Sequence, residues 1–210
     1  MGWNMSVLLV LVIVTLSSSG TLALPDHVPV ERHPNICISM EPESHHHQPT
    51  TATGPPPYTI EVSSPTYKTG ESIQVTLRVN DSSGVFFKGF FLQARRQCES
   101  VLKCDPDCTT RPVGSFSGVP KGAETLNCSK DADALGHTNN HAITSMTVTW
   151  KPGPDDKEPI VFWATIVQGP PHKYWSGVHS EKVNNIGSFT ASVNVSTLVI
   201  ALLVAVFTSI

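Results

Sequence analysis

Residues 72–79 read SIQVTLRV and alternate strictly between polar and apolar side chains. Ile73, Val75, Leu77 and Val79 fall on one face of an extended chain, and the polar side chains between them fall on the other. A period of two predicts a strand with one buried face and one solvent-exposed face. Turn-forming residues bracket this stretch, KTG at 68–70 and NDSSG at 80–84, so the expected strand is short.

The same kind of pattern recurs along the chain. We expect further strands at residues 58–63 (YTIEVS), 85–94 (VFFKGFFLQA), 143–150 (ITSMTVTW) and 160–167 (IVFWATIV). The last stretch is apolar on both faces, which predicts a central position in its sheet. No amphipathic helix of ten or more residues is evident. Short strands separated by turns predict an all-β, antiparallel sandwich over residues 58–183.

Both ends of the chain are apolar, VLLVLVIVTL at residues 7–16 and LVIALLVAVF at 198–207. We interpret residues 1–23 as a signal peptide, with a retained signal-anchor helix as the alternative. Residues 184–210 resemble a spacer and hydrophobic anchor signal, in which Asn185 or Ser188 would receive a glycolipid. The alternatives are a short membrane helix and a buried strand. Together the two ends predict an extracellular protein, secreted or anchored to the outer face of the plasma membrane.

Composition limits the classes of function. The chain has 14 basic and 17 acidic side chains among 210 residues, with a formal net charge of -3, and these charges do not form blocks. This distribution does not fit nucleic-acid binding. Residues 24–57 are rich in proline and histidine and lack a hydrophobic period, so we expect an extended N-terminal arm before the sandwich.

Five cysteines and three glycosylation sequons lie in the segment that would be exported. In an oxidising compartment cysteines favour disulfides. We therefore expect one local disulfide and one spare thiol among Cys98, Cys104 and Cys108. The sequons begin at Asn80, Asn127 and Asn194, and the last of these counts only if the C-terminal tail is retained.

We identify no catalytic constellation and expect no cofactor. His45, His46 and His47 form the one metal-like cluster, but adjacent side chains on an extended chain alternate in direction, so a solvated linker is the preferred interpretation. A zinc site among the three inserted cysteines lacks a fourth ligand nearby.

A basic surface is the candidate ligand site. Lys88, Arg95, Arg96 and Arg111, flanked by aromatic residues, would suit an anionic microbial polysaccharide or lipid. The alternative is a solvated strand face without a ligand.

Several segments, in this order and spacing, resemble the reeler domain family. They are CISMEP at 37–42, YKTG at 67–70, FKGFFLQAR at 87–95, VTWKP at 148–152, FWATIV at 162–167 and YW at 174–175. The resemblance covers Cys37 to about Val178 and implies an immunoglobulin-like sandwich. It also implies a disulfide between Cys37 and Cys128. The insert at residues 97–110, which carries three cysteines, departs from the family pattern.

The resemblance implies three functions. Small secreted defence proteins of this family point to a non-enzymatic binding module of innate immunity that recognises microbial surfaces or acts against microbes. Reelin and F-spondin point to adhesion to extracellular matrix components. Ferric-chelate reductases carry a similar domain before a haem-binding membrane part, so a redox-associated role is the third hypothesis. The chain has no such multi-helix part, and we expect no enzyme activity.

Overall fold

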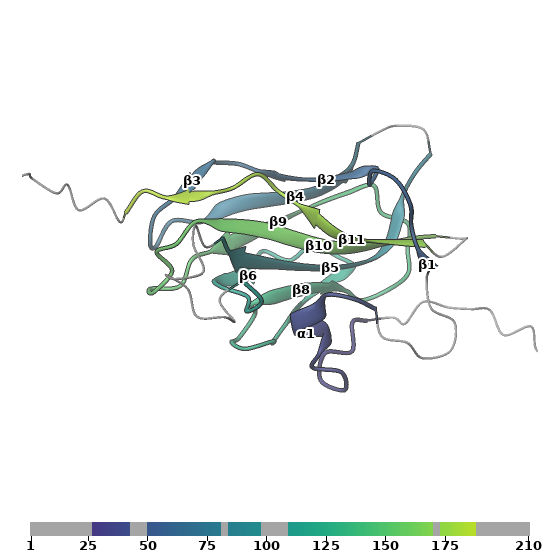
Figure 1. The fold of residues 1–210 in the computed structure, drawn as a ribbon, viewed down its shortest axis with the longest axis horizontal. Helices are drawn as coiled ribbons and strands as arrows, with labels where there is room; N and C mark the ends of the chain where they lie inside the picture. The colour runs from purple at the N-terminus through teal and green to yellow at the C-terminus, as the bar shows by residue number, and fades with distance from the viewer. Residues whose placement is uncertain (1–26, 43–49, 81–83, 98–108, 170–172, 188–210) are drawn as a thin grey trace, which may run out of the picture.

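The computed structural model describes residues 27–42, 50–80, 84–97, 109–169 and 173–187, which form two β-sheets packed face to face (Figure 1). The larger sheet has the strand order β1-β11-β10-β5-β8-β7, and the smaller has the order β2-β4-β9-β6. All pairings within these sheets are antiparallel except that of β1 with β11. The prediction of an all-β antiparallel sandwich is confirmed.

The strands have the following bounds. The larger sheet comprises β1 (Thr50–Thr51), β5 (Phe87–Arg96), β7 (Ala123–Leu126), β8 (Ala134–His137), β10 (Ile160–Gln168) and β11 (Lys173–His179). The smaller sheet comprises β2 (Tyr58–Val62), β4 (Ile73–Val79), β6 (Ser115–Ser117) and β9 (Ser145–Lys151). A separate parallel pair joins β3 (Thr66–Tyr67) to β12 (Asn184–Asn185).

The stretch with period two forms β4, in the centre of the smaller sheet. Ile73, Val75 and Leu77 are buried in the core between the sheets, and Val79 is half-buried at the strand end. The partner strand β9 alternates in the same way and buries Trp150 completely. The outer face of this sheet carries threonine and other polar side chains, as expected for a sheet with one solvated face.

Strand β10 lies between β5 and β11, in the interior of the larger sheet, as its uniformly apolar sequence predicts. Its inner face, which includes Phe162, Ala164 and Ile166, packs in the main core. Most of its outer face is also buried, because the N-terminal segment of the domain covers the larger sheet from outside.

That N-terminal segment differs from the extended arm expected at residues 24–57. Helix α1 (Ile36–Ser39) lies against the outside of the larger sheet (Figure 1). Val28, Val30, Ile36 and Met40 pack there on Phe91 of β5. A four-residue helix is too short to generate a helical period, so pattern analysis could not detect it. The folded domain therefore begins before residue 58, and through β12 it extends beyond residue 183.

Candidate functional site

Arg95, one of the four residues of the expected basic surface, is buried and cannot contact a ligand through an exposed face. It is 8% exposed, and its guanidinium donates hydrogen bonds to the carbonyl oxygens of Cys37 (2.9 Å) and Ile38 (3.0 Å). Burial lowers the pKa of Arg95 to about 10, because desolvation disfavours the charged form. This part of the ligand-surface prediction is wrong: Arg95 holds the end of helix α1 on the sheet.

Gln93 and a disulfide complete this attachment of the N-terminal segment. Gln93 Nε2 donates to the Cys37 carbonyl (3.2 Å) and to Cys128 Sγ (3.3 Å), and Arg95 Nε donates to Gln93 Oε1 (2.9 Å). Cys37 and Cys128 form a disulfide with a Cα–Cα distance of 5.5 Å, which is the pairing that the family resemblance implies. The Thr165 hydroxyl donates to the Met40 carbonyl. These contacts make residues 36–40 a clasp on the outer face of the larger sheet.

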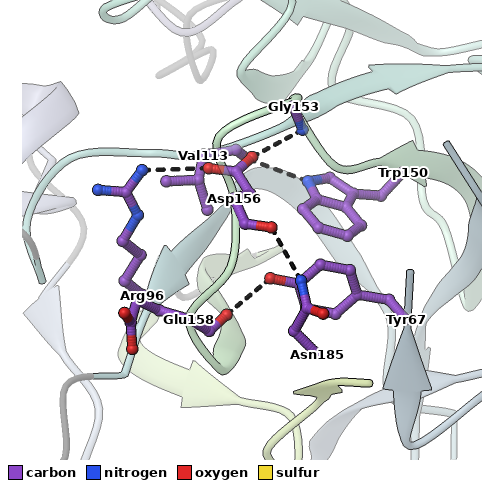
Figure 2. Close-up of polar contacts among 8 residues, drawn as sticks. All are labelled: Tyr67, Arg96, Val113, Trp150, Gly153, Asp156, Glu158 and Asn185. Atoms are coloured by element: carbon purple, nitrogen blue, oxygen red, sulfur yellow. Dashed lines mark hydrogen bonds and ion pairs between the residues drawn. The ribbon is translucent and has the colours of Figure 1, made fainter. Parts of the chain in front are cut away.

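Arg96 is the neighbour of Arg95, but its side chain extends in a different direction. Its guanidinium contacts Asp156 Oδ1 at 3.2 Å, as Figure 2 shows. Asp156 is 2% exposed, and its other carboxylate oxygen accepts the Gly153 backbone N–H at 2.7 Å. Arg96 therefore neutralises the buried carboxylate of Asp156, which belongs to the 152–159 loop.

Lys88 lies far from the other three residues of the expected surface. It occupies the start of β5 and Arg96 the end, so eight residues of extended chain place their Cα atoms about 26 Å apart. Arg111 is exposed beside Pro112, which bridges to Arg95 at the Arg96 end of β5. Because the basic residues lie at opposite ends of one strand, the single four-residue surface expected from the sequence does not exist.

Asn185, a predicted lipid-attachment residue, belongs to the folded domain. Its side chain donates to the Asp156 carbonyl (2.9 Å) and accepts the Gly187 N–H (2.7 Å), and Tyr67 donates to the Glu158 carbonyl beside it (2.7 Å; Figure 2). Burial raises the pKa of Tyr67. Cleavage after Asn185 would remove Gly187 from this cluster, so the geometry disfavours Asn185. Ser188 lies outside the described residues.

A different set of lysines lies along one rim of the larger sheet. Tyr174 of β11 pairs with Val167 of β10, and Val167 pairs with Gly89 of β5, so Lys173 and Lys88 lie at the same end of the sheet. Gly122 accepts the Thr138 N–H from the end of β8, which places Lys121 at this end as well. Strands are about 4.8 Å apart, so neighbouring lysines of this row are about 10 Å apart. We call Lys88, Lys121 and Lys173 the lysine rim.

A β-bulge raises Lys88 out of the regular pleat. Val167 pairs with Gly89 and Gln168 pairs with Phe87, so Lys88 is an extra residue without a partner in β10. Phe87 is buried in the core, whereas Lys88 is half-buried near Gly169 and the ring of Phe86. Bulges commonly redirect a side chain at the edge of a sheet.

The two ends of the sandwich differ in charge. The described turns at the rim end, residues 52–57, 84–86, 119–122, 138–144 and 168–169, contain no aspartate or glutamate. One carboxylate, that of Glu41, interacts with the Tyr174 side chain next to Lys173. The turns at the other end carry Glu71, Asp131, Asp155, Glu158 and Glu181. The rim is therefore the end of the domain better suited to an anion. Lys121 and Lys173 could not be assigned to this site from the sequence, because only strand register brings them level with Lys88.

Some of the remaining predicted site residues lie within the described ranges and others lie outside them. Asn80 and Asn127 are exposed. Asn194, Cys98, Cys104, Cys108 and the histidines 45–47 all lie outside the described residues, as do both apolar ends. Within the described ranges, no group of three potential metal ligands comes together. None of the helices in those ranges has the length and apolar character needed to span a membrane.

Comparison with known proteins places this sandwich in a family. The family model described as Reeler domain matches residues 35–190. The chain belongs to the Reeler domain family. "Putative defense protein 3" of Antheraea mylitta is 30% identical over 149 residues, which are 71% of this chain and 82% of that protein. The crystal structure of the human F-spondin reeler domain is similar, with 24% identity and a TM-score of 0.48, and the match covers 64% of this chain and 93% of that one.

Reductases contain a Reeler domain as one part of a longer protein. "Ferric-chelate reductase 1" of Mus musculus is 34% identical over 164 residues, which are 76% of this chain but 24% of that protein. The chain thus spans about a quarter of the length of this relative. Its match covers the Reeler domain, and the match includes no separate enzymatic domain.

Proposed function

We propose that this Reeler domain is an extracellular, non-enzymatic binding module of innate immune defence, tethered to the cell surface through its C-terminal tail. Its ligand is an anionic glycolipid or polysaccharide of a microbial surface. The lysine rim carries this proposal: three lysines in register occupy an end of the sandwich where the five turns named above have no carboxylate and Glu41 interacts with Tyr174. The similarity to a protein named as a defence protein supports the immune role.

The position of the rim supports the same proposal. Strand β12, which leads to the C-terminal tail, pairs with β3 at one end of the sandwich, and β1 and β11 meet at the other end (Figure 1). A lipid anchor after β12 would therefore hold the rim away from the membrane. Exposed charges attract an anion over roughly 8–10 Å at physiological salt, so several lysines in a row act on one extended polyanion.

The test is binding of the purified domain to lipopolysaccharide, with neutral β-glucan and heparin as the comparison ligands. We expect binding to lipopolysaccharide that weakens as salt is raised. The variant with Lys88→Ala, Lys121→Ala and Lys173→Ala should lose this binding. The control variant with Lys68→Ala, Lys151→Ala and Lys182→Ala removes the same charge from the other end and should retain it.

Three outcomes oppose the proposal. An equal loss of affinity for lipopolysaccharide in both triple variants would mean that net charge alone governs binding. Binding to heparin without lipopolysaccharide would favour the matrix-adhesion function. Retention of full affinity by the rim variant would place the ligand elsewhere. The tether is tested separately: phosphatidylinositol-specific phospholipase C should release the protein from intact cells, and failure to release it would replace the lipid anchor with a membrane helix.

A further inference from the structure

The sequon Asn127-Cys128-Ser129 is built into a closed loop. Asn127 Oδ1 accepts the Ala132 N–H at 2.8 Å, and the Ser129 hydroxyl donates to Asp133 Oδ2 at 2.8 Å. Cys128, between them, is bonded to Cys37. Both side chains that define the sequon, and the residue between them, are therefore engaged in the folded domain.

Asp133 is the centre of this loop. Its carboxylate is completely buried and accepts backbone N–H groups from Cys128 (2.7 Å), Ser129 (2.8 Å) and Lys130 (2.7 Å). Ala132 has a positive φ of 55°, which turns the chain back toward Asn127. A buried carboxylate needs such donors, so the loop and the carboxylate stabilise each other. Cys128 can reach Cys37 while the loop is closed in this way.

Glycosylation of Asn127 requires the loop at residues 127–133 to be open. An oligosaccharide passes from a lipid-diphosphate donor to Asn Nδ2: the new C–N bond forms, the C–O bond to the diphosphate breaks, and the amide loses a proton. The acceptor is an N-x-[ST] segment whose hydroxyl takes part in recognition. In the closed loop the Ser129 hydroxyl is bonded to Asp133 and is not available.

We propose that glycosylation of Asn127 and closure of the Cys37–Cys128 disulfide are competing events in the secretory compartment. In closure, the two thiols are oxidised and pass two electrons and two protons to a disulfide-bearing oxidoreductase, which is reduced. Once the bridge has formed, Asn127 stays unmodified. This proposal depends on export of the chain but not on the ligand of the lysine rim.

Asn80 provides an internal reference in the same chain. It is exposed at the end of β4, and its backbone N–H donates to the Pro57 carbonyl at 2.9 Å. It is not adjacent to a cysteine in the sequence. Its modification should therefore be independent of the disulfide.

The test expresses the full chain in eukaryotic cells and measures site occupancy in total lysate, so that a variant retained by quality control is still counted. Peptide-N-glycosidase F in heavy-oxygen water labels each occupied asparagine for mass spectrometry. We expect low occupancy of Asn127 in the wild-type chain and a several-fold rise in Cys37→Ala. Asp133→Ala, which opens the loop and leaves both cysteines in place, should also raise it. Asn80 occupancy should stay constant.

The matched control is Cys98→Ala, which removes a cysteine but leaves the bridge intact, and it should leave Asn127 occupancy unchanged. A thiol reductant added to cells that express the wild-type chain should reproduce the effect of Cys37→Ala. Equal high occupancy in wild type and Cys37→Ala would overturn the proposal. Low occupancy in both would overturn it too, because the disulfide would then not be what prevents modification.

Discussion

Removal of the Cys37–Cys128 disulfide should lower the stability of the domain by a calculable amount. The bridge joins residues separated by 91 positions. In the chain-entropy model, closing a loop of this length stabilises the folded state by about 4–5 kcal/mol. Domains of this size lose about 2–4 °C of melting temperature per kcal/mol, so replacing both cysteines by alanine should lower Tm by about 8–20 °C.

The structure also predicts where the domain should loosen first. Without the bridge, the clasp depends on the hydrogen bonds from Arg95, Gln93 and Thr165 and on a small apolar cluster. Local opening follows the weakest attachment, so trypsin should cut after the exposed Arg32 faster in the variant, before the sandwich unfolds.

The assay compares thermal unfolding by circular dichroism and limited trypsin digestion in two chains. Both carry Cys98→Ala, Cys104→Ala and Cys108→Ala, so no new disulfide can form, and one of them also carries Cys37→Ala and Cys128→Ala. A fall in Tm of less than about 3 °C, or roughly 1 kcal/mol, would refute the loop-closure reasoning. Faster cleavage without a change in Tm would mean that the bridge secures only the N-terminal segment.

Three further predictions concern buried groups. Burial raises the pKa of Tyr58 to about 12, above its unfolded value of 10.0, so its stabilising contribution of about 2–3 kcal/mol should be complete below pH 10 and lost as pH rises through about 12. Urea unfolding at about pH 9 and about pH 11 should show this fall, and Tyr58→Phe should remove much of it. Arg95→Leu removes the donor to the Ile38 carbonyl and leaves the Cys37 carbonyl with Gln93 alone, so it should cost about 2–4 kcal/mol in urea unfolding, while rim binding by the folded fraction stays unchanged. If that variant lost binding at full stability, Arg95 would be a ligand residue after all. Gly114→Ala would drive a Cβ into the Trp150 ring at a positive φ of 67° and should cost about 2–4 kcal/mol, whereas Gly70→Ala, with φ 88° and open space, should cost only about 1 kcal/mol. Equal melting temperatures for the two glycine variants would contradict this packing argument.

The strands that the sequence predicted well are those whose burial alternates or is complete. β4 and β9 each bury every second side chain, and β10 buries both faces, so their apolar periods survive in the sequence. β6 and β7 have three or four residues and expose part of each, which leaves too few apolar positions for a period. β11 contains a bulge at Ser176 and Gly177, and Gly177 has a φ of 70°, so its alternation is broken.

The candidate ligand site was harder to predict, because charge along a strand does not show which face or end a side chain occupies. Arg95 and Arg96 are adjacent in the sequence, yet one holds helix α1 and the other neutralises Asp156. Lys88 and Arg96 belong to the same strand and lie at opposite ends of it. Lys121 and Lys173 are distant from Lys88 in the sequence and level with it in the sheet.

The sequence by itself determined the class of fold, the central position of residues 160–167 and, through its resemblance to the family, the pairing of Cys37 with Cys128. These properties depend on the hydrophobic period and on the order of the residues, and both can be read directly from the sequence. Only the tertiary structure decided that residues 27–42 belong to the domain, that Arg95 is a buried support and that three separate lysines form one rim. Those properties depend on strand register and on what covers each sheet face, and neither is present in any single stretch of the chain.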